Sequence, residues 1–169
     1  VRPIPSGFSF DQACNFAGNY ETAYHCLVAR GGLTAQDTVL IHGAAGGVGH
    51  LMIQVARAFG VIVITTSSSR ERADFCISMG ADIALVRSAQ RFVDAVKEST
   101  MGRGVDVVVD CIGGATVNDN LQALRLGGRY VMLASDDMGA ARVDLQKIID
   151  KRLTVTGSSL RSREPSYRS

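Results

Sequence analysis

A glycine-rich segment at residues 43–49, Gly-Ala-Ala-Gly-Gly-Val-Gly, constrains the fold of this chain more than any other feature. An apolar, β-branched run from Thr38 to His42 precedes it, and a helical pattern over residues 46–59 comes after it. Strand, glycine turn and helix in this order predict the start of a βαβ unit. The apolar residues of the helix fall on one stripe, at Val48, Leu51, Met52, Val55, Ala56 and Phe59.

The same alternation of strand and helix continues through the rest of the chain. Strands that are apolar on both faces, joined by amphipathic helices, predict a parallel sheet covered on both sides. The expected fold class is therefore α/β, a Rossmann-type doubly wound parallel sheet, in one domain over residues 1–169. The expected strands are 61–66, 83–86, 105–110, 129–134 and 153–160, and the expected helices are 69–79, 89–100, 116–124 and 144–150.

The first thirty residues have a different pattern. Residues 1–7 contain Pro and Gly, which predict an extended lead-in. Apolar positions then recur at helical spacing from Phe10 to Arg30, and Gly18-Asn19 predicts a break between two short helices. The chain starts without Met, in a segment typical of a linker entering a domain, so we expect it to be a piece of a longer protein.

The glycine turn carries the clearest functional signal. Gly46 would let the backbone approach a pyrophosphate, and Gly49 would permit close packing of helix on strand. The N–H groups of Gly47 and Val48 would point at the anion from the helix N-terminus. Ala44 replaces the first glycine of the usual fingerprint, which is tolerable if its φ is negative. The alternative is a tight turn without a ligand.

The end of the second strand predicts which dinucleotide binds. Rossmann domains that bind NAD carry an acidic residue there, whereas this chain reads Thr-Thr-Ser-Ser-Ser-Arg-Glu-Arg at residues 65–72. Hydroxyls and guanidinium groups suit the 2′-phosphate of NADPH, so NADPH is the expected cofactor. The alternative is that Ser69 caps the next helix while Arg70 and Arg72 only form its solvated face.

Composition excludes several other classes of protein. The chain has 18 basic and 16 acidic residues and a net charge of +2, so nucleic acid is not expected as a partner. No apolar run reaches the ~20 residues that span a bilayer, and no signal peptide is evident, so we expect a cytoplasmic protein without a membrane span. The four cysteines are expected to be small buried hydrophobic residues, namely Cys14, Cys26, Cys76 and Cys111.

Together these motifs resemble the zinc-independent quinone oxidoreductase branch, of the zeta-crystallin type, of the medium-chain dehydrogenases/reductases. The C-terminal motif at residues 159–163 resembles the p53-inducible quinone reductase members of that branch. The resemblance implies a GroES-like catalytic domain outside this chain, with residues 1–9 as the lead-in from it. Its other anchors are residues 4–9, 22–24, 39–49, 102–108 and 110–114.

The resemblance also implies a set of cofactor-binding residues. Thr22 would lie near the nicotinamide, and Arg87 stands where many relatives carry Tyr, so it would stack on the adenine or pair with the phosphate. The adenosine phosphate would be surrounded by Thr66, Ser67, Ser68 and Arg72. The nicotinamide ribose and carboxamide would be lined by Gly113, Leu133, Ala134 and Ser135. The pyrophosphate would take Ala44, Gly46, Gly47, Val48 and Gly49.

Zinc is not expected at the active site. Zinc-dependent relatives carry a ligand four residues before the position of Thr22, where this chain has Gly18. A catalytic zinc needs three protein ligands, and His25, His42 and His50 do not belong to a recognisable ligand cluster. No catalytic residue can be named, because the residues that shape the substrate pocket belong to the domain outside this chain.

Three functions remain open. The leading prediction is hydride transfer from NADPH to a quinone or an α,β-unsaturated carbonyl, with the isolated chain binding cofactor weakly and turning over no substrate. The alternatives are an enoyl-thioester (enoyl-CoA or acyl carrier protein) reductase and a non-catalytic, NADPH-binding crystallin or RNA-interacting protein. The last strand, 153–160, would form an edge of the sheet and pair two copies into a homodimer.

Overall fold

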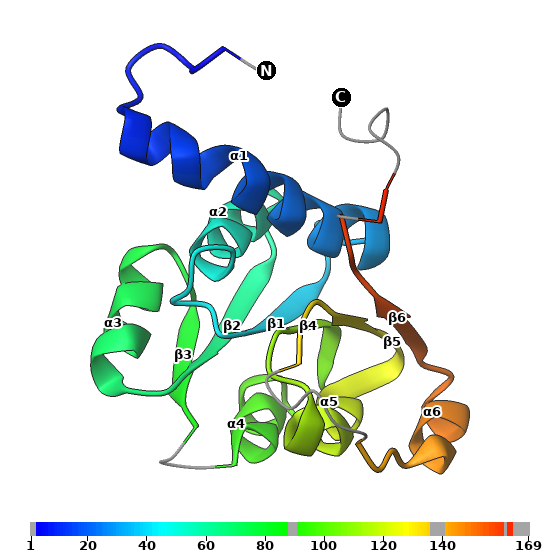
Figure 1. Cartoon of the computed structure of the whole chain (residues 1–169). Coiled ribbons are helices and arrows are strands. Elements are labelled where there is room, and N and C mark those ends of the chain that lie inside the picture. The colour runs from blue at the N-terminus through cyan, green and yellow to red at the C-terminus, as the bar shows by residue number, and fades with distance from the viewer. Residues whose placement is uncertain (1–2, 88–90, 136–140, 161, 164–169) are drawn as a thin grey trace.

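A parallel sheet of six strands forms the centre of the computed structural model, which describes residues 3–87, 91–135, 141–160 and 162–163 (Figure 1). The strand order is β3-β2-β1-β4-β5-β6, the arrangement of a doubly wound Rossmann sheet. The predicted fold class is thus confirmed. The strands are β1 (Thr38–His42), β2 (Ile62–Ser67), β3 (Ile83–Val86), β4 (Val105–Asp110), β5 (Leu124–Met132) and β6 (Thr154–Gly157).

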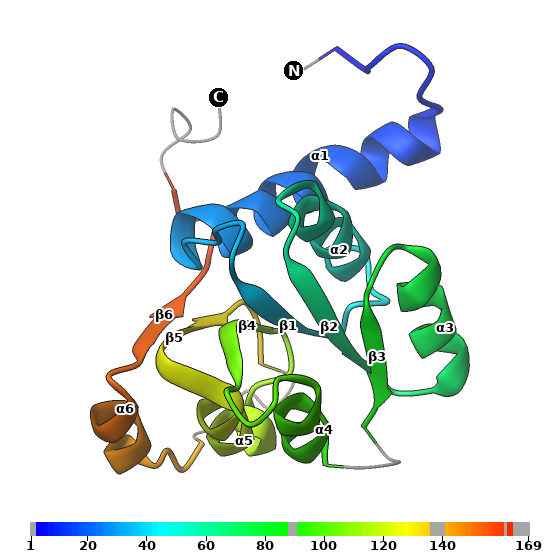
Figure 2. The same ribbon diagram turned by 180° about the vertical axis from the view of Figure 1, so that it is seen from behind.

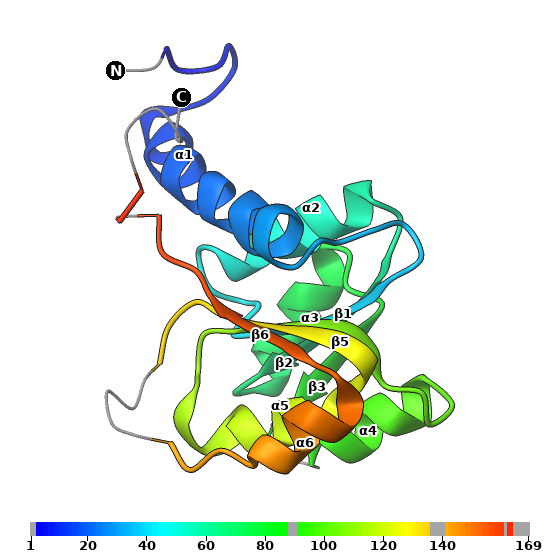
Figure 3. The ribbon, with the colours of Figure 1, turned by 90° about the vertical axis from the view of Figure 1, so that its right-hand side faces the viewer.

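Helices cover both faces of the sheet. Seen along the sheet, α1 and α2 lie on one side and α4, α5 and α6 on the other (Figure 3), and the view from behind agrees (Figure 2). Helix α3 belongs to the first side, since its Cys76 packs in the same core cluster as α2. The helices are α1 (Phe10–Tyr24), the π-helix η1 (His25–Arg30), α2 (Gly49–Ala58), α3 (Arg70–Ser78), α4 (Phe92–Ser99), the 3₁₀ turn η2 (Gly114–Thr116), α5 (Val117–Ala123) and α6 (Leu145–Lys151).

The hydrophobic core is divided by the sheet. Val39 and Ile41 of β1 enter the cluster under α1, α2 and α3, whereas Leu40 between them enters the cluster under α4 and α5. Successive side chains of a strand point to opposite faces, so each inner strand serves both clusters. This explains why the strand sequences are continuously apolar rather than alternating.

The predicted break at Gly18-Asn19 is wrong, because α1 is continuous from Phe10 to Tyr24. A capping box between Ser9 and Gln12 starts the helix. Thr22 Oγ1 donates a hydrogen bond to the Gly18 carbonyl at 2.7 Å. A glycine inside a helix costs only about 1 kcal/mol, which these local contacts offset.

The next turn changes its hydrogen-bond spacing. Residues His25–Arg30 form a π-helix, which ends where the Gly31 N–H donates to the Cys26 carbonyl at 2.9 Å, in agreement with the helical pattern predicted up to Arg30. The Arg30 Nε donates to the Gly157 carbonyl at 3.0 Å. The Cys26 thiol donates to Ser158 Oγ at 3.2 Å. This turn is therefore attached to the end of β6.

Several predicted boundaries differ from the structure. Strand β5 begins at Leu124 rather than at 129, because Leu124 pairs with Val105 before a register shift. Helix α2 begins at Gly49 rather than at 46, because Gly46 closes a turn with the carbonyl of Gly43. Strand β6 is shorter than 153–160 but lies at the edge of the sheet, as predicted. The predicted residues at 1–2, 89–90 and 161 lie outside the described part of the chain.

The cysteines are all free. Cys26 and Cys76 are buried, as predicted, whereas Cys14 is exposed on α1 and Cys111 is half-buried. The prediction of four buried thiols is therefore wrong for Cys14, which falls on the outer face of a surface helix. Within the described residues, no helix is long and apolar enough to cross a membrane.

Candidate functional site

The glycine turn joins the carboxyl end of β1 to α2. Gly43 adopts a φ of +63°, and the Gly46 N–H donates to the Gly43 carbonyl at 3.0 Å. Ala44 is buried, and its φ is negative, as predicted, since the described non-glycine residues with positive φ are Met101 and Arg152. Within the described residues, no side chain caps the N-terminus of α2. This helix end therefore presents N–H groups and a positive dipole at the turn.

Gly49 is required by its backbone neighbours, whereas Gly47 lies against a side chain of α1. A Cβ on Gly49 would lie 2.5 Å from the Cα of Ala44, so only glycine allows the helix to start this close to the strand. A Cβ on Gly47 would lie 3.0 Å from the amide nitrogen of Asn19 on α1. The turn is therefore confined on one side by β1 and on the other by α1.

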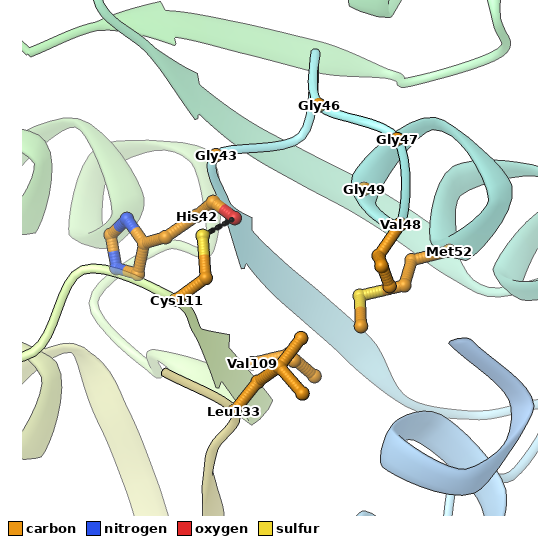
Figure 4. Close-up of a pocket in the computed structure, with 10 residues that line it drawn as sticks. All are labelled: His42, Gly43, Gly46, Gly47, Val48, Gly49, Met52, Val109, Cys111 and Leu133. Atoms are coloured by element: carbon orange, nitrogen blue, oxygen red, sulfur yellow. Dashed lines mark hydrogen bonds between the residues drawn. The ribbon is translucent and has the colours of Figure 1, made fainter. Parts of the chain in front are cut away.

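A central cavity of about 210 Å³ opens beside this turn. Figure 4 shows Val48 and Met52 of α2 on one side of it and Val109, Cys111 and Leu133 on the other. The thiol of Cys111 donates to the His42 carbonyl at 3.2 Å. The remaining lining residues are His42, Gly43, Gly46, Gly47 and Gly49.

A second, smaller cavity of about 90 Å³ lies toward β2 and β3. Its polar lining comes from Ser67 and Ser68 at the end of β2, Arg72 on α3 and Arg87 after β3. It also shares Gly43 and Gly46 with the central cavity and includes Ala45. Ser67, Ser68 and Arg72, which the resemblance assigned to the adenosine phosphate, are thus brought together with Arg87, for which it left adenine and phosphate open.

The sequence left two interpretations of the residues after β2, a phosphate site and a helix cap with solvated arginines. The structure contains features of both. Ser69 caps α3, with its Oγ accepting from the Arg72 N–H at 3.3 Å. The Arg70 side chain pairs with Asp74 at 3.0 Å and is 82% exposed, so it belongs to the solvated face. Arg72 differs because it lines the cavity. The cap and the cation therefore act at the same helix end.

A third cavity, of about 310 Å³, lies beyond the ends of β4 and β5. It brings together Gly113, Leu133, Ala134 and Ser135, which the sequence assigned to the nicotinamide end. Gly113 has a φ of +67°, and a Cβ there would collide with Ser135. The other lining residues are Gly114, Val117, Met132 and Ala141.

The three cavities adjoin one another, because they share lining residues, and together they are called the track. Gly43 and Gly46 line both the smaller and the central cavity, and Leu133 lines both the central cavity and the third. The track runs along the carboxyl ends of the parallel strands and crosses the point between β1 and β4 where the strand order reverses. Open α/β sheets bind their ligands at this position.

Three predicted residues lie off the track. Ala44 is fully buried in the core cluster on the α2 side and lines none of the three cavities. Thr66 is buried, and its Oγ1 lies 2.6 Å from the Nδ1 of His42 instead of facing the smaller cavity. Thr22 lines none of these cavities, and its hydroxyl is bonded to α1 itself. Sequence reasoning missed Met52, Val109 and Cys111. Met52 lies one turn into α2, and Val109 and Cys111 lie at the end of β4. These positions in the sequence could have indicated that the three residues line the site.

Within the described residues, no group of three or more His, Cys, Asp or Glu side chains is placed to hold a metal ion. The imidazole of His50 bonds to the Gly46 carbonyl at 2.9 Å, and the ring of His42 is buried on the side of α5. At the position before Thr22 where zinc-dependent relatives carry a ligand, α1 has Gly18.

Fold and glycine turn define a Rossmann-type α/β domain, and comparison with known families places it more narrowly. Residues 47–168 match the family described as zinc-binding dehydrogenase. The chain belongs to this family, within the medium-chain dehydrogenases/reductases.

Similar curated proteins include polyketide synthases and quinone oxidoreductases. The chain is 34% identical over 140 residues to one component of the phenolphthiocerol/phthiocerol polyketide synthase of Mycobacterium tuberculosis, covering 83% of this chain and 6% of that protein. It is 29% identical over 158 residues to the quinone oxidoreductase of Rattus norvegicus, covering 94% of this chain and 47% of the relative. The chain therefore spans about half or less of the length of these relatives.

Several solved structures share the fold of this chain. AibC superposes with a TM-score of 0.87 at 34% identity, covering 92% of this chain and 43% of AibC. A mycobacterial protein in complex with NADPH gives 0.85 at 31% identity, covering 93% of this chain and 49% of that protein. The CurK enoyl reductase gives 0.85 at 25% identity, covering 99% of this chain and 50% of that one.

Proposed function

We propose that this chain binds NADPH along the track of cavities at the carboxyl edge of its sheet. The observation that carries the proposal is the order of the three adjoining cavities, which leads from two arginines, past an uncapped helix N-terminus, to an apolar cavity. These chemistries match, in order, the 2′-phosphate, the pyrophosphate and the nicotinamide end of the cofactor. A related protein was solved with NADPH bound.

The smaller cavity would hold the 2′-phosphate. Arg72 and Arg87 supply two guanidinium groups from different elements, and Ser67 and Ser68 supply hydroxyls. The NAD-type carboxylate at the end of β2 is absent from the sequence, so no anion opposes the phosphate there. This set favours NADPH over NADH.

The other end of the track would orient the nicotinamide. Gly113, Leu133, Ala134 and Ser135 form one wall, and Leu133 continues it into the central cavity. NADPH supplies a hydride from the C4 atom of its nicotinamide, and the protein's part is to orient that ring and exclude water. Thr22 remains a predicted neighbour of the ring.

We further propose an electron-poor acceptor, a quinone or an α,β-unsaturated carbonyl, and chemistry without zinc. Gly18 at the ligand position supports the absence of zinc. The second candidate is reduction of an enoyl thioester. It is favoured by the higher identity to the mycobacterial polyketide synthase, 34% against 29% for the rat quinone oxidoreductase, and by the likeness to the CurK enoyl reductase.

We also propose a homodimer through β6. This strand is at the edge of the sheet, and most of its residues are exposed. Its outer backbone groups can extend the sheet into that of a second copy.

The cofactor proposal is tested by titrating the chain with NADPH and with NADH in a calorimeter. NADPH is expected to bind at least about tenfold more tightly, the effect of ~1.4 kcal/mol from the phosphate contacts. Equal affinities would contradict the proposal.

The acceptor is tested separately with the full-length protein. NADPH oxidation is measured with an ortho-quinone, an enone and an enoyl-CoA. Turnover of the first two supports the leading candidate, whereas turnover of enoyl-CoA alone supports the second. Silence with all three would remove both.

A further inference from the structure

Beneath the track lies a chain of buried polar side chains. The Oγ1 of Thr66 is 2.6 Å from Nδ1 of His42, whose Nε2 is 2.7 Å from Oδ1 of Asn120. The Asn120 amide nitrogen donates to Oδ2 of Asp110 at 2.9 Å. Tyr130 donates its hydroxyl proton to the same oxygen at 2.6 Å. All five side chains are buried, so each polar group depends on the others for its hydrogen bonds.

The hydrogen bonds from Thr66 to Asp110 all have the same direction, with each side chain donating to the next. The carboxylate of Asp110 accepts, so the Asn120 amide must face it with its NH₂ group and turn its oxygen toward His42. His42 must then carry its proton on Nε2 and accept from the Thr66 hydroxyl on Nδ1. Burial lowers the pKa of His42, which keeps the ring neutral, as this pattern requires. The side chains therefore have one consistent arrangement of protons.

Asp110 also holds the loop after β4. Its Oδ1 accepts from the Ile112 N–H at 2.7 Å, and both carboxylate oxygens lie 3.2 Å from the Gly113 nitrogen. These bonds stabilise Gly113 in its positive-φ conformation at the wall of the third cavity. Loss of the carboxylate would release this loop.

The chain of bonds ends at the opposite side of the track. His42 and Thr66 are register partners in β1 and β2. The residue after His42 is Gly43, and the residue after Thr66 is Ser67, and both line the smaller cavity. One buried network is thus joined to the backbone segments at both ends of the proposed cofactor site.

We propose that Thr66, His42, Asn120 and Asp110 form a positioning network that fixes the 2′-phosphate end and the nicotinamide end of the track relative to each other. None of the four touches the cofactor through this network; they act through Ser67, Gly43 and Gly113. The inference rests on the proposed NADPH function only in the affinity measurement described below. The measurement of the Gly113 amide signal does not depend on that function.

The test uses a matched pair of substitutions at one end of the network. Thr66→Val is nearly isosteric and removes the hydroxyl, whereas Thr66→Ser keeps it. The chain is labelled with ¹⁵N, and the amide signal of Gly113 is monitored without cofactor. We expect Thr66→Val to move the Gly113 signal and Thr66→Ser to restore it. An unmoved signal in Thr66→Val, or equal shifts in both variants, would overturn the proposal.

The second arm measures affinity. Thr66→Val is expected to weaken NADPH binding by about tenfold, the effect of a lost hydrogen bond that leaves a buried acceptor unpaired. Thr66→Ser is expected to bind within about twofold of the wild-type chain. Affinity that is unchanged in Thr66→Val would overturn the network's role in binding. If the wild-type chain itself fails to bind NADPH, the cofactor proposal is wrong. The amide signal of Gly113 then still tests whether the network couples Thr66 to Gly113.

A third measurement needs no variant and so covers the case that Thr66→Val does not fold. The ¹⁵N shifts of the His42 ring in the wild-type chain are expected to show the proton on Nε2 alone. A proton on Nδ1, or rapid exchange between the two nitrogens, would contradict the directed chain of bonds.

Discussion

The Cβ position of Gly49 lies 2.5 Å from the Cα of Ala44, 2.6 Å from the Gly43 carbonyl oxygen and 2.7 Å from that of Ala44. All three neighbours are backbone atoms, which cannot rotate away as a side chain can. Helix α2 and the glycine turn therefore touch directly, and this contact sets the position of the helix N-terminus at the proposed pyrophosphate site.

Gly49→Ala should destabilise the fold and displace that helix end. We expect the free energy of unfolding to fall by about 3 kcal/mol, the upper range for overpacking a rigid site. Urea denaturation monitored by circular dichroism measures the loss. Gly157→Ala is the control, because nothing lies within 4 Å of its Cβ position. A Gly49→Ala variant as stable as this control would contradict the close contact.

Gly18→Ala, in contrast, should raise the free energy of unfolding. Gly18 lies inside the continuous helix α1, and its Cβ position has no neighbour within 4 Å. Alanine therefore gains helix propensity without a clash, and unfolding should cost about 0.5–1 kcal/mol more. Thermal unfolding of the two chains is the measurement. A loss of stability would restore the break that the sequence predicts at this residue.

Arg72→Ala and Arg87→Ala should each weaken NADPH binding by about tenfold, because each removes a charge-assisted contact with the 2′-phosphate. NADH affinity should change by less than about twofold. Arg70→Ala is a matched control on the same helix turn, since Arg70 pairs with Asp74 at the surface. Calorimetric titration of each variant with both cofactors decides the matter. Equal losses for NADPH and NADH would remove these arginines from the phosphate site.

Asp106→Asn should cost stability in a pH-dependent way. Asp106 is buried, which by itself opposes ionisation, but bonds from Arg125, the Thr38 N–H and Arg103 hold its pKa below the usual value. A depressed folded pKa adds stability that is complete above the unfolded pKa, near 4, and is lost as pH falls through the folded pKa.

Breaking these buried pairs should lower the free energy of unfolding by about 3 kcal/mol at pH 7, and the gap to the wild-type chain should narrow below about pH 4. Urea denaturation at a series of pH values measures both. Asp150→Asn is the control, because Asp150 is exposed on α6. A gap that stays constant down to about pH 3 would contradict the depressed pKa.

Val155→Lys should convert the proposed dimer into a monomer. Val155 lies in the edge strand β6 and is 37% exposed, and a lysine on an edge strand opposes pairing with another chain. Light scattering at micromolar concentration gives the mass. Ile62→Lys, at an exposed position of the inner strand β2, should leave the mass unchanged. A wild-type chain that is already monomeric would refute the dimer.

Sequence periodicity predicted the sheet well, because inner strands such as β1 and β4 are buried on both faces, whereas helices such as α2 and α4 are buried on one. The strands Ile83–Val86 and Val105–Asp110 have the predicted bounds. The effect of one glycine and the start of one strand were predicted wrongly. Gly18 does not interrupt α1, and the start of β5 at Leu124 depends on pairing with Val105, a contact between distant residues that periodicity does not contain.

The proposed site was predictable where it depends on backbone turns. Gly43 to Gly49 and the serines and arginines after β2 are evident from local sequence, and the structure brings Ser67, Ser68 and Arg72 of this segment to one cavity. Thr66 shows the limit. It lies one residue before Ser67, and only the alternation of the strand, with His42 as its neighbour on β1, turns its hydroxyl inward. The network under the site joins side chains from four elements, so no spacing in the sequence predicts it.

The π-helix at His25–Arg30 makes the tolerance of this segment to deletions depend on where they fall. A π-helix carries one residue more per hydrogen-bonded turn than an α-helix and accommodates it within that turn. Deleting one residue there would return the turn to α-helical spacing with little rotation of the residues that follow. A deletion inside the regular helix α1 would instead rotate the residues on its two sides relative to each other by about 100°. The contacts of Arg30 with the Gly157 carbonyl and of Cys26 with Ser158 should therefore survive a deletion in the π-turn better than α1 packing survives one in α1.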